Sequence, residues 1–204
     1  IEIVQGPSSL AYGAGAFSGG INIITKKRRQ NDFQAKLEGG MHALINMETR
    51  VGINTKSTLH QLSAGYRQSD GYIANSDYKL LNLLWQSRFE TENSYIDFTA
   101  GYNDKKYGAN TFYTPAFANQ YDDTQSIFLS VKGETNGKLK FIPQLYWNRH
   151  YDEFQLIRGD DSSIPYNVHQ SDVMGANMQW QYASSIGITS FGGEFRNEAI
   201  LSSV

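Results

Sequence analysis

The sequence lacks cysteine, a strong net charge of either sign and any long apolar run. Its net charge of -2 gives no basic surplus to indicate nucleic-acid binding, and no strong acidity to indicate a disordered chain. Mean hydropathy is -0.48, and no window approaches the roughly 18 consecutive apolar residues of a membrane-spanning helix. A helical membrane protein is therefore excluded. The absence of cysteine fits export through an oxidising compartment and fits a soluble protein equally.

The start of the chain also lacks a familiar feature. Ile1 is not methionine, and the first residues show neither the charged segment nor the apolar segment of a secretory leader. We therefore expect either processing that removed more than a leader, or a fragment of a longer protein.

What the sequence does have is strict alternation. From Phe33 onward, apolar residues recur at every second position and the residues between them are polar. In one segment Ile96 and Phe98 share a face, and Asp97 and Thr99 lie on the opposite face. We count about nine such segments, each of which is typical of a strand with one apolar and one polar face.

The connections between these segments alternate in length. Short turns are expected at 54–57, 91–93, 135–138 and 184–187, and longer loops at about 69–78, 107–123 and 152–168. This rhythm is typical of an outer-membrane barrel, in which short periplasmic turns alternate with long external loops. A soluble β-sandwich or lipocalin-like barrel stays open as an alternative, although it does not predict the rhythm.

The fold class that we expect is all-β, a transmembrane antiparallel β-barrel. A closed barrel that holds a plug needs about 22 strands, so about nine strands predict part of a barrel. One residue is anomalous: Pro143 is expected on the lipid-facing side of a strand, where it removes a hydrogen bond from the ladder.

The most specific motif spans residues 1–26, IEIVQGPSSLAYGAGAFSGGINIITK. It resembles the C-terminal end of the plug domain in TonB-dependent outer-membrane receptors, where an I-E-x-x-x-G-P-x-S-x-x-Y-G pattern precedes A-x-x-G-x-I-N-I-x-T-K. Packing roles are expected at these positions, because glycine permits close backbone approach and proline fixes a turn. The residues concerned are Glu2, Gly6, Pro7, Ser9, Tyr12, Gly13, Gly19, Asn22 and Thr25.

The resemblance implies a domain division and a function. We expect the end of the plug and a linker in residues 1–32, and the N-terminal part of the barrel in residues 33–204. A TonB-dependent receptor is a transporter, not an enzyme, and lies in the bacterial outer membrane. Its partners are membrane lipid, a small nutrient molecule and the TonB energy-coupling complex, which binds a box expected upstream of this chain. No nucleic-acid partner and no required cofactor are expected.

A second resemblance concerns the ligand. Residues 105–124, 138–158 and 192–204 are similar to Bacteroidetes-type receptors related to the outer-membrane cobalamin transporter. This implies active uptake of a large, scarce nutrient, with a cobalamin-like corrinoid as the expected ligand. Uptake of a ferric siderophore or of haem stays open as an alternative, and so does a passive porin or adhesin-type barrel.

Two kinds of site residue are expected in the external loops. Aromatic rings can cover the apolar parts of a large chelate or corrin, and the expected contacts are Tyr107, Phe112, Tyr113, Tyr121 and Tyr166. Those near strand ends suit the aromatic girdle of a membrane barrel equally well. Structural calcium can bridge loops through carboxylate oxygens, and the expected ligands are Asp70, Asp77, Asp122 and Asp123, with solvated loop acids as the alternative.

Catalytic and nucleotide sites are not expected. The four histidines are scattered without the spacing of metal ligands. The segment GAGAFS after the first strand is a poor dinucleotide fingerprint, because its third glycine is replaced by Ser18 and strand-like residues follow where a helix is required.

Overall fold

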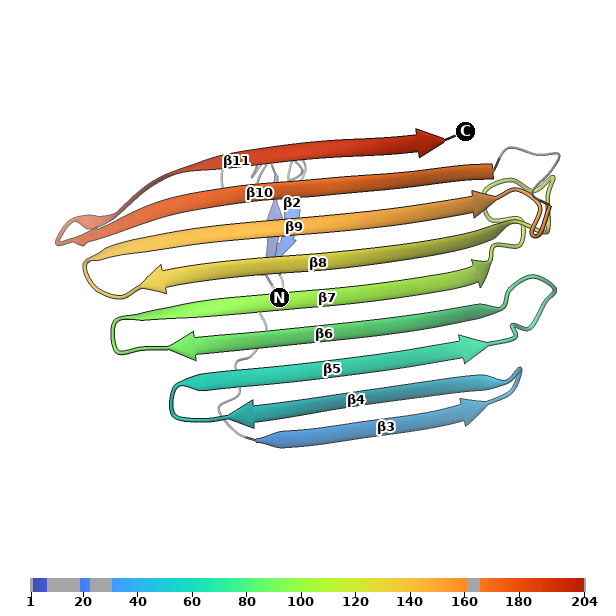
Figure 1. Cartoon of the computed structure of the whole chain (residues 1–204), viewed down its shortest axis with the longest axis horizontal. Coiled ribbons are helices and arrows are strands. Elements are labelled where there is room, and N and C mark those ends of the chain that lie inside the picture. The colour runs from blue at the N-terminus through green and yellow to red at the C-terminus, as the bar shows by residue number, and fades with distance from the viewer. Residues whose placement is uncertain (1, 7–18, 23–30, 161–165, 204) are drawn as a thin grey trace.

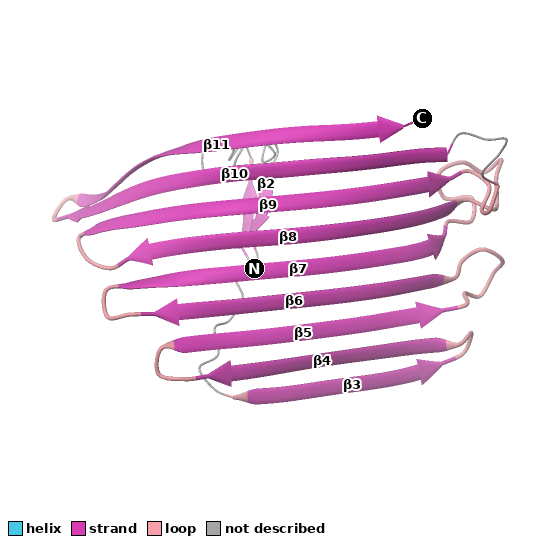
Figure 2. Ribbon diagram, in the orientation of Figure 1, coloured by secondary structure: helices cyan, strands magenta, loops and turns pink. Residues whose placement is uncertain are grey.

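The computed structural model describes residues 2–6, 19–22, 31–160 and 166–203. The strands are β1 (Glu2–Gln5), β2 (Gly19–Asn22), β3 (Asp32–Gly40), β4 (Leu44–Asn54), β5 (Thr58–Ser69), β6 (Tyr78–Glu90), β7 (Ser94–Gly108), β8 (Tyr121–Thr135), β9 (Leu139–Gln155), β10 (Tyr166–Ser184) and β11 (Gly187–Ser203). For the residues that are described, Figure 2 shows strands and loops and no helix. Across these residues, no helix is long and apolar enough to cross a membrane.

Strands β3 to β11 form one antiparallel sheet in which every strand pairs with its neighbours in chain order. Figure 1 shows them side by side in a single layer, with short turns along one end and longer loops along the other. Strands β1 and β2 form a separate two-stranded antiparallel sheet. The prediction of an all-β fold with about nine antiparallel strands is confirmed.

The register aligns the apolar faces of neighbouring strands. Trp85 of β6 lies opposite Ala100 of β7, which lies opposite Leu129 of β8. Leu129 in turn lies opposite Trp147 of β9, which lies opposite Met174 of β10. Because residues directly opposite each other project to the same side of a sheet, the apolar side chains form one continuous band across it.

This apolar band is exposed. Leu145 is 61% exposed and Phe195 is 67% exposed, and the buried hydrophobic residues of the described chain comprise Ala109 alone. A β-sandwich would bury such a face against a second sheet. An exposed apolar face on one side and a polar face on the other is instead the organisation of a barrel wall between lipid and an aqueous interior.

Pro143 interrupts the ladder on one side only. The last pair between β8 and β9 joins Lys132 to Gln144, the residue that follows Pro143 in the chain. Pairing between β9 and β10 instead continues through Pro143 toward the short turn. Thr135 compensates on the interrupted side, since its Oγ1 accepts the backbone N–H of Phe141 at 2.9 Å. The missing N–H of proline therefore falls where the two strands already separate toward their turn.

The rhythm of short and long connections has one exception. The first connection at the long-loop end, between β3 and β4, comprises residues 41–43 only. It turns through two consecutive residues with left-handed backbone, His42 at φ 57° and Ala43 at φ 53°. At the long-loop end of the sheet, the connection between β3 and β4 is therefore short, and the connections from β5 to β10 are long.

Candidate functional site

Three segments at the long-loop end lie close together and are called the rim loops: residues 70–77, 109–120 and 156–160. Each follows a strand of the sheet, so their spacing is set by the strands below them. Two direct backbone hydrogen bonds join them. Asn110 N donates to Asn75 O at 3.1 Å, and Arg158 N donates to Asn119 O at 2.8 Å.

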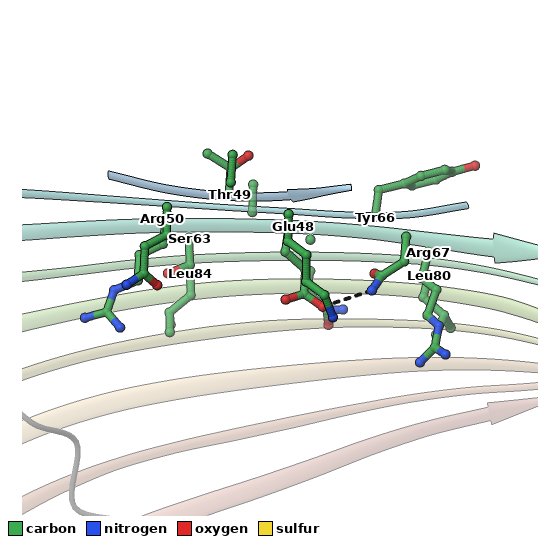
Figure 3. Close-up of a pocket in the computed structure, with 15 residues that line it drawn as sticks. Glu48, Thr49, Arg50, Ser63, Tyr66, Arg67, Leu80 and Leu84 are labelled. Carbon is green, nitrogen blue, oxygen red and sulfur yellow. Dashed lines mark hydrogen bonds between the residues drawn. The ribbon is translucent and has the colours of Figure 1, made fainter. Parts of the chain in front are cut away.

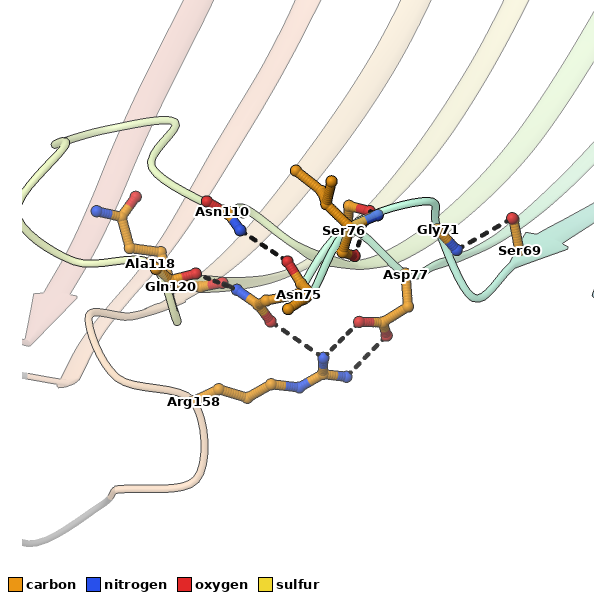
Figure 4. A network of polar contacts seen from close by, with 11 residues as sticks. Ser69, Gly71, Asn75, Ser76, Asp77, Asn110, Ala118, Gln120 and Arg158 are labelled. Atoms are coloured by element: carbon orange, nitrogen blue, oxygen red, sulfur yellow. Dashed lines mark hydrogen bonds and ion pairs between the residues drawn. The ribbon is translucent and has the colours of Figure 1, made fainter. Parts of the chain in front are cut away.

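Arg158 clamps the first rim loop to the third. Its guanidinium donates to both carboxylate oxygens of Asp77, at 2.7 and 3.0 Å, and to Asn75 Oδ1 at 3.3 Å (Figure 4). The same guanidinium lies 4.4 Å from the ring centre of Tyr121, a distance suited to cation–π attraction. The Arg158 hydrogen bonds hold the pKa of Asp77 below its usual value, and the carboxylate raises the pKa of Arg158.

Asn75 fastens the first rim loop to the second. Its Nδ2 donates to the carbonyl oxygens of Ala118 at 3.0 Å and Gln120 at 2.6 Å (Figure 4). Its backbone is left-handed, with φ 53°, a conformation that asparagine tolerates better than most residues. Gly108 is required beside it, because a Cβ at that position would lie 2.6 Å from both Asn75 O and Asn75 Oδ1.

A buried carboxylate anchors the second rim loop to the sheet. Asp122, at the start of β8, is 2% exposed, and its Oδ2 accepts the hydroxyls of Tyr107, at 3.2 Å, and Tyr113. Burial and the hydrogen bond to Asp122 raise the pKa of Tyr113. The Tyr113 ring also packs edge-on against Phe154 and Phe112, with ring centres 5.0 and 4.8 Å apart.

Gln120 completes the second rim loop from within. It is fully buried, its Nε2 donates to Thr114 O at 3.0 Å, and its Oε1 accepts the backbone N–H of Tyr113 at 2.9 Å. Together these contacts give the loops a fixed shape through polar side chains rather than through an apolar core.

The five aromatic residues predicted to contact ligand fall in different positions. The hydroxyls of Tyr107 and Tyr113 are bound to Asp122, and the Tyr121 ring lies beneath Arg158. Phe112 is 75% exposed and remains the most accessible ring of the group, while Tyr166 begins β10 and is partly exposed. Their contact with a ligand stays a prediction.

The four predicted calcium ligands do not gather at one point. Asp77 is bound by Arg158, Asp122 by the two tyrosines, and Asp123 Oδ2 by Lys106 Nζ at 2.8 Å. Asp70 opens the first rim loop, where its backbone N–H donates to His42 O. Over the described part of the chain, no cluster of three or more His, Cys, Asp or Glu side chains suits a metal ion. The calcium site also stays a prediction.

The N-terminal motif is only partly described. Pro7, Ser9, Tyr12, Gly13 and Thr25 lie outside the described residues. Gly6 has φ 85°, a left-handed conformation that favours glycine, and the backbones of Glu2 and Asn22 pair across β1 and β2. The division between the two domains after residue 32 stays a prediction.

Sequence reasoning missed a second candidate site on the polar face of the sheet. A hollow of about 750 Å³ lies over β3 to β6. Figure 3 shows Arg50, Arg67 and Glu48 pointing to one side of the sheet, together with Leu80, whereas Tyr66 points to the other. The available signal was a pair of small residues at polar-face positions of β5, Ser63 and Gly65.

Comparison with known proteins places this fold. No protein-family model matches the chain, and neither does any curated protein sequence. Among solved structures, it is similar to the copper transporter OprC, with a TM-score of 0.74 and 16% sequence identity. The match covers 98% of this chain and 33% of the transporter chain, so the chain spans about a third of the length of that protein. This likeness shows that the chain shares its fold with part of that transporter.

Proposed function

We propose that the chain is part of a TonB-dependent transporter that takes up a scarce nutrient across the bacterial outer membrane. The observation that carries this proposal is the nine-stranded sheet, with its exposed apolar face, polar face and transporter-like topology. The motif of residues 1–26 supports the TonB-dependent class, because it resembles the end of a plug domain. Lipid, the nutrient and the TonB energy-coupling complex are the partners of such a protein.

The rim loops support a receptor role in this proposal. A ligand arriving from outside meets them first, and they are held in shape by Arg158, Asn75 and Asp122. Loops ordered before binding lose less conformational entropy when a ligand binds, which favours affinity. The exposed Phe112 ring on the second rim loop then contacts apolar parts of the ligand.

For the substrate, we propose a metal-containing nutrient. A cobalamin-like corrinoid is the ligand that the sequence resemblance favours, and a ferric siderophore or haem is the alternative. The similar solved structure is named as a copper transporter, and we add copper to the substrates to be tested for that reason. A passive porin or adhesin-type barrel is the remaining alternative.

Uptake by the full-length protein tests this function. Cells that express it are given radiolabelled cyanocobalamin, a ferric siderophore, haem or copper, with and without a functional TonB complex. We expect accumulation of one substrate that is lost when TonB is absent. Accumulation that does not depend on TonB, or an open-pore conductance in planar bilayers, would instead indicate a passive barrel. Siderophore uptake without cobalamin uptake would replace the preferred substrate.

A further inference from the structure

We propose that the hollow over β3 to β6 is a binding subsite for anionic ligands, namely carboxylate or phosphate groups carried on a partly apolar body. The hollow has a volume of about 750 Å³, within the usual range for small-molecule sites. The inference rests on the proposed transport function in one respect: it assigns an anionic charge to the substrate that passes this part of the wall. Binding itself requires no energy coupling.

Small side chains create the hollow. In the register of β4 and β5, Glu48 lies opposite Gly65 and Arg50 lies opposite Ser63. Glycine and serine leave space on the polar face of β5 where neighbouring strands carry long side chains. The longer residues on either side therefore form walls around an open floor (Figure 3).

The lining carries more positive than negative charge. Its cationic side chains are Lys36, Arg50 and Arg67, and its single carboxylate is Glu48. Lys36 is already neutralised by Glu38, with Nζ and Oε2 2.8 Å apart. The two arginines therefore determine what the hollow attracts.

Neither arginine forms an ion pair with a carboxylate of the described residues, although the Glu38 carboxylate, which is bound by Lys36, attracts Arg67 at longer range. Arg50 Nη2 donates to the neutral Gln61 Oε1 at 2.7 Å, and its Nε is buried without a hydrogen-bond partner. The Arg67 side chain makes no hydrogen bond or ion pair with any other described residue. A planar guanidinium in this state is suited to bidentate binding of a carboxylate or phosphate.

Other arginines on the same polar face are paired. Arg88 donates to both oxygens of Asp97 at 2.6 Å, and Arg196 lies 2.5 Å from Glu198. An unpaired guanidinium is therefore not a general property of this wall, and Arg196 provides an internal control.

The spacing of the two arginines defines the ligand further. Arg67 lies opposite Asn46, and Arg50 is four residues farther along the same strand face. At about 3.3 Å per residue, the two positions are roughly 13 Å apart along the strands. Leu80 and Leu84 of β6 line the space beside them. A ligand with two separated anionic groups and an apolar centre matches this arrangement.

Chemical modification of the full-length protein in detergent tests the subsite. Phenylglyoxal reacts with accessible guanidinium groups, and mass spectrometry reads the extent at each arginine. Decanedioate, a long dicarboxylate, is the competing probe. Butanedioate tests the spacing, and decamethonium, a long dication without a reactive amine, tests the charge. We expect decanedioate to slow modification of Arg50 and Arg67 at least fivefold, with half-protection at a concentration about tenfold lower than for butanedioate. Decamethonium should protect neither arginine, and decanedioate should not protect the control residue Arg196.

A variant links the two arginines. In Arg67→Gln, half-protection of Arg50 by decanedioate should need about a tenfold higher concentration, while Lys79→Gln, which changes a residue on the opposite face, should not alter it. Absence of protection, or equal protection of Arg196, would overturn the proposal. Failure of both arginines to react would also overturn it, because another part of the protein would then cover the hollow. TonB-dependent uptake with no protection would reject this subsite alone, and protection without uptake would reject the transport function alone.

Discussion

The buried carboxylate of Asp122 should control the order of the second rim loop. Asp122→Ala removes the acceptor of two tyrosine hydroxyls, those of Tyr107 and Tyr113. The Tyr113 hydroxyl belongs to the loop itself, whereas Tyr107 lies on β7. Removing the carboxylate therefore detaches the middle of the loop from the sheet. It also leaves the two tyrosine hydroxyls without this acceptor, at a position where Asp122 is only 2% exposed.

The size of the effect follows from these two bonds. A hydrogen bond to a charged group contributes about 1.5 to 3 kcal/mol, and the 3.2 Å bond from Tyr107 belongs at or below the lower end. Because Tyr113 itself is half exposed, water replaces part of the lost interaction. We expect a cost of about 2 to 2.8 kcal/mol for docking of the loop. At 1.4 kcal/mol per factor of ten, the open loop becomes roughly 30 to 100 times more populated.

Amide hydrogen exchange measures this population. The informative amides are those of Ala109 and Tyr113, which donate to Gln120 O at 2.8 Å and Gln120 Oε1 at 2.9 Å. Both should exchange roughly 30 to 100 times faster in Asp122→Ala, while amides of β4 should be unchanged. Asp123→Ala is the matched control, since that carboxylate is bound by Lys106 on the other face. Exchange within twofold of the wild type, or an equal increase in the control, would refute the anchoring role of Asp122.

Two further predictions concern the clamp between Asp77 and Arg158, and a third concerns the apolar band of the sheet. Asp77→Ala should speed tryptic cleavage after Arg158 about two- to fivefold, because an ion pair with side chains 41% and 37% exposed contributes about 0.5 to 1 kcal/mol. An unchanged cleavage rate would refute the role of this pair in holding the loop. Because the pKa of Asp77 lies below its usual 3.8, the clamp should hold at any pH above that value and weaken as the pH falls through the lowered pKa, which amide exchange of the first rim loop can follow. The Trp180 ring stacks on Phe191, with ring centres 5.3 Å apart, near the short turn between β10 and β11. In a variant that retains Trp180 as its single tryptophan, brominated lipids should quench its fluorescence more strongly when bromine lies near the headgroups than when it lies at the bilayer centre. The opposite order would place the membrane elsewhere on the sheet.

The sheet was predictable because alternation is a local property. The apolar face of each strand consists of residues two positions apart in the chain, such as Ile96 and Phe98, and short turns bring each strand beside the next. Pairing in chain order then follows without long-range information. The three-residue connection at 41–43 was not anticipated, because it needs two consecutive residues with left-handed backbone and Ala43, unlike His42, is not of a type enriched in that conformation.

The site was less predictable because its contacts join residues that are far apart in the chain. Asp77 and Arg158 are separated by 81 residues, and only the register of the intervening strands brings them together. Tyr107 and Tyr113 look alike to sequence reasoning as ligand contacts, yet both are engaged by Asp122, whose position opposite Tyr107 depends on the pairing of β7 and β8. The hollow near Gly65 likewise depends on which residues of β4 face it.

The clamp between Asp77 and Arg158 also bears on how such a protein can diversify. Loops vary more among homologues than the strands that they join, but here the carboxylate lies in one loop and the guanidinium in another. A crossover that replaces the first rim loop alone removes the partners that Arg158 and the carbonyl groups of Ala118 and Gln120 find in that loop. Under the proposed transport function, new specificities should therefore arise by joint replacement of the three rim loops, or by substitutions that spare Asn75, Asp77 and Arg158.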